Sequence, residues 1–201
     1  MKRHMTALIV TLAAATAMAR TYTPATLPLS TTLDTEVVTN FPCAFGNAAI
    51  NGLSVQMAFF GSATNAVELA FGRDADGDGA LGACEAEMAI GWDCGWWVLR
   101  GRDEAFSCAC GDGDVEAEVG MEFRIGVLRG RPKSWTATIG GESANFGIPQ
   151  EGEGDDAHMP VPCWLFNPEW NVARVSVRGI GGASERLRFE TDVNALTIRI
   201  R

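Results

Sequence analysis

Apolar and polar residues alternate one by one in several short stretches of this chain, and this pattern is the strongest constraint on its fold. Successive side chains of a β-strand face opposite sides, so each stretch predicts a strand with one buried face. The 23 glycines supply turn residues between such strands. We therefore expect an all-β, antiparallel sandwich-like domain with little helix. The stretches lie at residues 55–59, 115–127, 135–139, 173–177, 187–189 and 196–200.

Two further alternating stretches flank a segment that is rich in aspartate and glycine. Val67, Leu69 and Phe71 precede the segment, and a second alternation runs from Cys84 to Cys94. We expect a strand on each side, joined by the segment. The residues that follow it, Glu-Ala-Glu-Met-Ala, are good helix formers, so one or two helical turns remain an alternative there.

The segment itself, residues 74–85, fills the pattern D-x-[DN]-x-[DN]-G-x5-E without a gap. Ca²⁺ binds about six to eight oxygen ligands, and this spacing delivers them from one short stretch. Three alternating carboxylates would repel one another in a bare turn, and a cation removes that cost. The sequence therefore predicts a structural Ca²⁺ site. The expected ligands are the carboxylates of Asp74, Asp76 and Asp78, the carbonyl of Ala80, a water at Gly82 and a bidentate Glu85.

This segment resembles the calcium loops of the EF-hand superfamily and of dockerins, and the resemblance covers residues 74–85 only. It implies a calcium site. An EF-hand needs a helix on each side of the loop, whereas the flanks here predict strands. Dockerins carry two such loops and this chain has one full copy, so docking to a cohesin is not implied. The alternative interpretation is a metal-free turn, since Asp and Gly are common turn residues.

Residues 1–19 have the features of a secretory signal peptide. A basic start precedes an apolar run that is too short to span a bilayer, and an A-x-A cleavage site ends at Ala19. Cleavage near Ala19 would leave one β-rich domain, residues 20–201, that is secreted, periplasmic or at the cell surface. A Pro- and Gly-containing loop near 147–162 is the place where that domain would divide, if it divides.

The chain is acidic. Its net charge of −9 becomes −11 once Lys2 and Arg3 are lost with the signal peptide. Nucleic acids and anionic membranes bind clustered basic residues, which this sequence lacks, so we expect no nucleic-acid partner. No later stretch reaches eighteen consecutive apolar residues, and the mature chain is expected to have no transmembrane segment.

Six cysteines in an exported chain favour disulfides. Cys84 and Cys94 bracket one predicted strand and would lie too far apart to bond each other. The expected partner of Cys94 is Cys108 or Cys110, across the next hairpin. Zinc is the less favoured alternative, because the C-x2-C spacing is absent and the mature chain has only His158. The candidate disulfide residues are Cys43, Cys84, Cys94, Cys108, Cys110 and Cys163.

The sequence does not decide whether the chain is an enzyme, but it favours a noncatalytic module. No nucleophile, zinc-protease or phosphate-binding motif is present, and we name no catalytic residue. Asp112 and Asp114 resemble half of a second cation site, and a solvated turn is the favoured interpretation. His158 lies in an acidic loop, where simple exposure is favoured over a catalytic or metal role.

The six tryptophans suggest a binding role, because an exposed indole stacks on sugar rings, although most of them are expected to fill the core. Trp96 and Trp97 are adjacent, so a strand would point one inward and the other outward. We expect an exported, calcium-binding, disulfide-stabilised β module with a binding or surface role, carbohydrate binding being its more specific form. Its partner would be a glycan or a cell-surface protein. The alternatives are a secreted hydrolase with an unidentified carboxylate pair, and a structural envelope or assembly component.

Overall fold

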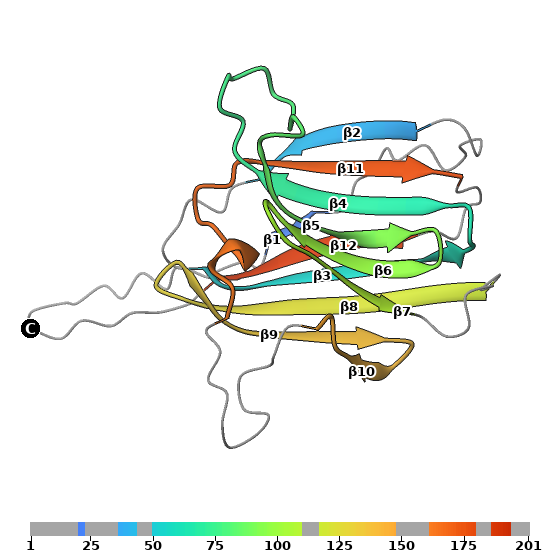
Figure 1. Ribbon diagram of the computed structural model, residues 1–201. Helices are drawn as coiled ribbons and strands as arrows, with labels where there is room; N and C mark the ends of the chain where they lie inside the picture. The colour runs from blue at the N-terminus through green and yellow to red at the C-terminus, as the bar shows by residue number, and fades with distance from the viewer. Residues whose placement is uncertain are drawn as a thin grey trace, which may run out of the picture.

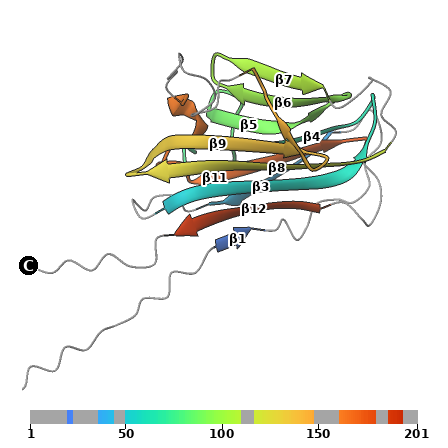
Figure 2. The ribbon, with the colours of Figure 1, turned by 90° about the horizontal axis from the view of Figure 1, so that it is seen from below.

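The computed structural model describes residues 20–22, 36–43, 50–109, 117–147, 161–179 and 186–193. The described strands form two six-stranded sheets that face each other, as Figure 1 and Figure 2 show from two directions. The first sheet has the order β1 (Arg20–Tyr22), β12 (Arg186–Val193), β3 (Ile50–Gly61), β8 (Ala117–Leu128), β9 (Arg131–Ile139) and β10 (Glu142–Ala144). The second has the order β2 (Glu36–Pro42), β11 (Val172–Arg178), β4 (Ala66–Gly72), β5 (Ala86–Asp93), β6 (Trp96–Gly101) and β7 (Ala105–Ala109).

All strand pairs are antiparallel, and the helix content of the described residues is one 3₁₀ turn, η1 (Cys163–Leu165). The predicted all-β antiparallel sandwich is therefore confirmed. Within the described residues, no helix has the length and apolarity needed to cross a membrane. Strand β11 belongs to the second sheet and β12 to the first, and residues 148–160, where the sequence predicts a loop, lie outside the described part of the chain.

The core lies between the sheets and includes alternating residues that the sequence identified at 55–59, 119–127, 135–137 and 173–177. The predicted strand at 196–200 lies outside the described residues. In β8 the burial of side chains alternates along most of the strand, because one face packs on the second sheet and the other is open. Large aromatic side chains occupy the centre, where Trp92 and Trp97 pack edge to face with ring centroids 5.5 Å apart. The fully buried tryptophans are Trp92, Trp97, Trp135 and Trp170.

Strand β5 departs from the expected alternation. It begins at Ala86, after a turn at residues 83–85, so neither a strand from Cys84 nor a helix after Glu85 is present. Five consecutive residues, 88–92, are buried on both faces. The outward-facing residues of this stretch are small, which explains their burial. Ala89 is covered by Leu81, and Gly91 lies against the backbone of β4.

A two-residue turn joins β5 to β6. Cys94 and Gly95 both have positive φ, 49° and 99°, which is the twist that a tight hairpin between right-twisted strands needs. The turn fixes the register in which Asp93 faces Trp96 and Trp92 faces Trp97. It therefore sends Trp97 into the core and Trp96 to the outer face of the second sheet.

The expected disulfides are not found between described cysteines. Cys84 is exposed and Cys94 half-buried, and they stand at opposite ends of β5 without bonding, as the strand length predicts. Cys94 is not bonded to Cys108 either, and its Sγ instead accepts a hydrogen bond of 3.4 Å from Nη2 of Arg178. Cys110, the other expected partner, lies outside the described residues.

Candidate metal centre and the adjoining sheet face

The predicted calcium segment forms the loop between β4 and β5, which projects beyond the strand ends in Figure 1. Its first residues are tied to the start of β11. The backbone N–H of Asp74 donates to Oδ1 of Asn171 over 2.9 Å, and the N–H of Asn171 donates to the carbonyl of Gly72 over 3.1 Å. The strand–loop–strand arrangement expected from the flanks is therefore present.

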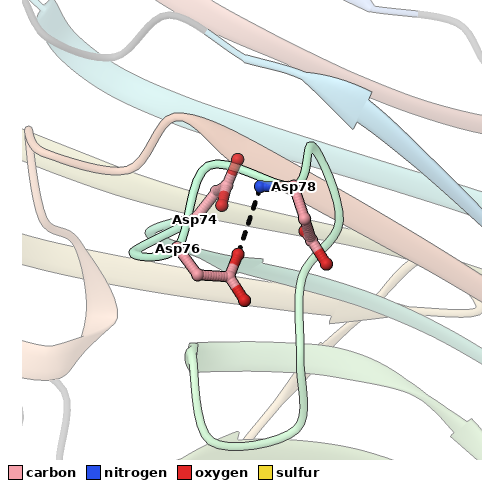
Figure 3. Close-up of side chains that lie close together, drawn as sticks. All are labelled: Asp74, Asp76 and Asp78. Atoms are coloured by element: carbon pink, nitrogen blue, oxygen red, sulfur yellow. Dashed lines mark hydrogen bonds between the residues drawn. The ribbon is translucent and has the colours of Figure 1, made fainter.

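The loop brings three of the predicted ligands together. One carboxylate oxygen from each of Asp74, Asp76 and Asp78 lies within 4.8 Å of the others. Figure 3 shows the three side chains on the loop. The carboxylate of Asp74 accepts hydrogen bonds from the N–H groups of Gly77 (2.6 Å) and Gly79 (2.9 Å). These two glycines have φ of 79° and 80°, a conformation that side-chain-bearing residues rarely adopt, and so they permit the curl of the loop.

The three carboxylates differ electrostatically. The N–H of Gly79, followed by other donors of the loop, holds the pKa of Asp74 below its ordinary value. For Asp76, the hydrogen bond from the N–H of Asp78 lowers the pKa. The charges of Asp78 and Glu85, partial desolvation and a contact with Asp74 together outweigh it, and the pKa of Asp76 is raised. Without a cation the loop thus carries unrelieved repulsion at Asp76.

Glu85 closes the loop from the other end. Its Oε1 accepts a hydrogen bond from the N–H of Ala75 and its Oε2 accepts one from the N–H of Gly82, both of 2.8 Å. The carboxylate therefore bridges the two ends of the loop rather than joining the cluster of three aspartates. The carbonyl of Gly82 accepts from the N–H groups of Glu85 and Ala86. Ala80 lies two residues after Asp78, and the backbone N–H of Ala80 donates to Oδ1 of Asp78.

Leu81 connects the loop to the sheet. It is buried against Ala70, Ala89 and Val172 on the outward face of the second sheet, so this part of the loop folds back over the sheet. Its backbone is held on both sides: the N–H donates to Oδ1 of Asn40, and the carbonyl accepts from Nη1 of Arg174, each over 3.1 Å. The calcium-loop pattern predicts an apolar contact from position eight, Leu81, to a core, but it does not predict which sheet face this residue covers.

The rest of that face is open and hollowed. A cavity of about 260 Å³ lies over the centre of the sheet, and its floor consists of small residues, Ala66, Ala89, Gly91 and Ser176. A second cavity of about 540 Å³ lies beside the end of the loop. The two cavities share Glu68, Ala89 and Arg100, and we call them together the outer groove.

An ion-pair network runs along the outer groove. Arg174 donates to Oε1 of Glu68 over 3.1 Å, and Arg100 donates to Oε2 of the same carboxylate over 2.9 Å. Arg100 continues to Asp93 at 3.0 Å, and Arg178 lies 3.8 Å from Asp93. Alternation along each strand predicts that these side chains face outward, but their meeting depends on the order β11–β4–β5–β6, which the sequence does not show.

The two adjacent tryptophans lie on opposite faces of β6. Trp97 is fully buried, so its predicted role as a ligand contact is wrong and it belongs to the core. Trp96 is 48 % exposed and lies on the outer face beside Val98, which lines the outer groove. The expectation that one indole points inward and the other outward is confirmed. Asp112, Asp114 and His158 lie outside the described residues.

No family model and no curated protein matches this sequence. Solved structures with similar folds include a carbohydrate esterase of the Shiga toxin-encoding bacteriophage phi24B, at 12 % identity and TM-score 0.43 over 90 % of this chain and 88 % of that one. The T. cruzi calreticulin globular domain matches at 13 % identity and TM-score 0.42 over 78 % and 67 %. A tetrameric galectin from Cinachyrella sp. matches at 12 % identity and TM-score 0.40 over 79 % and 99 %. Neither a family nor a ligand follows from similarities of this size.

Proposed function

We propose that this chain is a noncatalytic, calcium-stabilised module that binds carbohydrate in the outer groove. The observation that carries the proposal is the groove itself: a hollow on one sheet face, floored by small residues and edged by charged side chains, with the exposed indole of Trp96 on the same face. Ligand sites are typically concave, with a few polar groups that fix the orientation of the ligand.

Sugar hydroxyl groups both donate and accept hydrogen bonds, and the groove offers both kinds of partner. The guanidinium groups of Arg100 and Arg178 are donors, and the carboxylates of Glu68 and Asp93 are acceptors. The ion pairs among them hold the side chains in place before a ligand arrives, which lowers the entropic cost of binding. Trp96 adds a flat apolar surface on which the C–H face of a pyranose packs.

The calcium part of the proposal is supported by the aspartate cluster and by its electrostatics. The loop holds three carboxylate oxygens within 4.8 Å, and repulsion raises the pKa of Asp76. A divalent cation converts that repulsion into attraction. Asp74, Asp76 and Asp78 would hold the ion, with Ala80, Gly82 and Glu85 at the remaining positions of the pattern. Its contribution would be structural, through Leu81, because the loop covers part of the same sheet face.

Binding is favoured over hydrolysis by the state of the groove carboxylates. A glycosidase needs two carboxyl groups that face the scissile bond, one of them able to give up a proton. Glu68 is instead held by two guanidinium groups and Asp93 by Arg100. We also propose that the chain is exported, on the signal-peptide features of residues 1–19.

A glycan screen with the oxidised, calcium-loaded protein tests the proposal. We expect retention on at least one polysaccharide, lost in Trp96→Ala and kept in Phe60→Ala, which removes an aromatic residue of similar exposure from the first sheet. Equal retention of both variants would place the contact elsewhere. No retention of the wild-type chain on any glycan would overturn carbohydrate binding.

A further inference from the structure

The outer groove is electrostatically uneven. Its second cavity, beside the end of the loop, is lined by three arginines, Arg100, Arg102 and Arg174, and by two carboxylates, Glu68 and Glu87. The chain as a whole carries a net charge of −9, so a concentration of guanidinium groups at one place on its surface needs an explanation.

Glu87 does not neutralise this cavity. Its Oε2 accepts hydrogen bonds from the side chains of Asn167 (2.8 Å) and Trp170 (3.0 Å), and its Oε1 accepts one from Arg73 (3.2 Å). Arg73 supplies the opposite charge, and the lowered pKa of Glu87 fits this set of donors, which outweighs the desolvation of the carboxylate. Glu87 is thus engaged outside the cavity, with Arg73, which does not line it and also pairs with Glu169 at 2.8 Å.

Glu68 is shared. Its two carboxylate oxygens accept hydrogen bonds from Arg174 and Arg100, so one negative charge faces two positive charges. Asp93, the other partner of Arg100, lines the first cavity and not the second. Arg102 is exposed and makes no hydrogen bond or ion pair with any described residue. The second cavity therefore carries excess positive charge, centred on Arg102.

The guanidinium groups also have unused donors. Each has five N–H groups, and the hydrogen bonds that Arg100 and Arg174 make to Glu68, Asp93 and the carbonyl of Leu81 use two nitrogen atoms of each guanidinium. Planar guanidinium groups match carboxylate and sulfate oxygens in geometry as well as in charge. Because the second cavity adjoins the first through shared residues, an anionic group bound there would belong to a ligand that extends along the groove.

We infer that the outer groove is selective for acidic saccharides, and that its second cavity receives a carboxylate or sulfate group of the chain against Arg102, Arg100 and Arg174. This inference rests on the proposed function, since it assigns a substrate class to the same groove. It adds a residue, Arg102, that no sequence motif singles out.

The test compares matched ligands by titration calorimetry with calcium-loaded protein. The probes are a galacturonate tetramer, its fully methyl-esterified form, which has the same sugars without the charges, and a sulfated galactan tetramer. The variants are Arg102→Gln and, as a control, Arg131→Gln, which removes an exposed arginine from β9 in the first sheet.

We expect an acidic tetramer to bind at least tenfold more tightly than the methyl ester. Arg102→Gln should reduce that affinity by about tenfold, the size of one lost hydrogen bond to a charged group, and leave the ester unaffected. Arg131→Gln should change neither. Preference for the galacturonate or for the sulfated tetramer identifies the source of the anion.

Equal affinity for the charged and esterified tetramers would overturn the acidic selectivity and leave carbohydrate binding intact. If the Arg102→Gln variant still prefers the acidic tetramers over the methyl ester, the placement of the anionic group in the second cavity would be overturned. Absence of binding to every tetramer, together with a negative glycan screen, would remove the proposed function and this inference with it.

Discussion

Arg174 donates one hydrogen bond to the carbonyl of Leu81, so a side chain of the outer groove holds the aspartate-rich loop. The same guanidinium pairs with Glu68 in the middle of the groove. Leu81 in turn is buried against three residues of the sheet. The loop and the groove therefore share one packed region, and order in the loop is expected to stabilise the groove.

Leu81→Ala tests this connection. Removing the buried side chain should destabilise the fold by about 2–3 kcal/mol, at the lower end for leucine because the cluster around it is small. It should also weaken glycan binding. Chemical denaturation measures the first effect. Leu128→Ala, at a leucine that is 55 % exposed, is the control and should change stability by less than about 0.5 kcal/mol. Equal effects of the two substitutions would contradict the packing role of Leu81.

Asp76→Asn separates a metal site from a plain turn. Asparagine keeps the oxygen that accepts from the N–H of Asp78 but removes the charge. The pKa of Asp76 is raised, so in the metal-free protein the stability of this loop falls as pH rises through that pKa. At pH 7 in EGTA the variant should melt at the same temperature as the wild type or higher. In calcium it should melt several degrees lower, because a ligand is lost.

Thermal melts of both proteins in both buffers check the sign change. Asp103→Asn, in the exposed turn after β6, is the matched control and should behave as the wild type in each. A variant that loses stability equally with and without calcium would mean that Asp76 holds the turn by itself.

The two adjacent tryptophans should respond in opposite ways. Trp97 is fully buried between Phe59 and Trp92, so Trp97→Ala should cost about 3–5 kcal/mol of stability. Trp96→Ala should leave stability within about 0.5 kcal/mol and act on glycan binding alone. Urea unfolding monitored by circular dichroism distinguishes the two. A large loss of stability in Trp96→Ala would place that indole in the core and remove it from the binding surface.

Glu87→Gln should alter the acid side of the stability profile. The folded-state pKa of Glu87 is lowered, so the carboxylate contributes stability above its unfolded pKa of about 4.3, and this contribution is lost as pH falls through the folded-state value. The variant should be less stable than the wild type at pH 7, and the difference should narrow below about pH 4.3. Denaturant midpoints of the wild type and the variant, measured at several pH values from neutral to acidic, test this pH dependence. A difference that is constant with pH would mean that packing, and not charge, explains the loss.

The β-sandwich could be predicted because the sequence signals for its strands and for the loop are local. Alternation in residues such as Val67, Leu69 and Phe71 marks strands, and the pattern from Asp74 to Glu85 marks the loop between two of them. Both signals lie within short stretches of chain, and the structure places β4, the loop and β5 accordingly.

The outer groove was not predictable, because it is made by strands that are distant in sequence. Arg174 and Arg100 meet at Glu68 only because β11 and β5 lie on either side of β4, with β6 next to β5. The departure of β5 from simple alternation has the same origin. Ala89 is buried on the outward face by Leu81, a contact that no periodicity encodes.

Calcium binding to the loop is the claim on which the account depends most. Titration of Ca²⁺ into chelator-treated protein, followed by calorimetry, tests it directly. We predict one saturable site per chain with a Kd of about 10⁻³ M or tighter, the range of extracellular modules, and its loss in Asp78→Ala. No saturable binding up to about 10 mM Ca²⁺, or binding that persists in Asp78→Ala, would contradict the account.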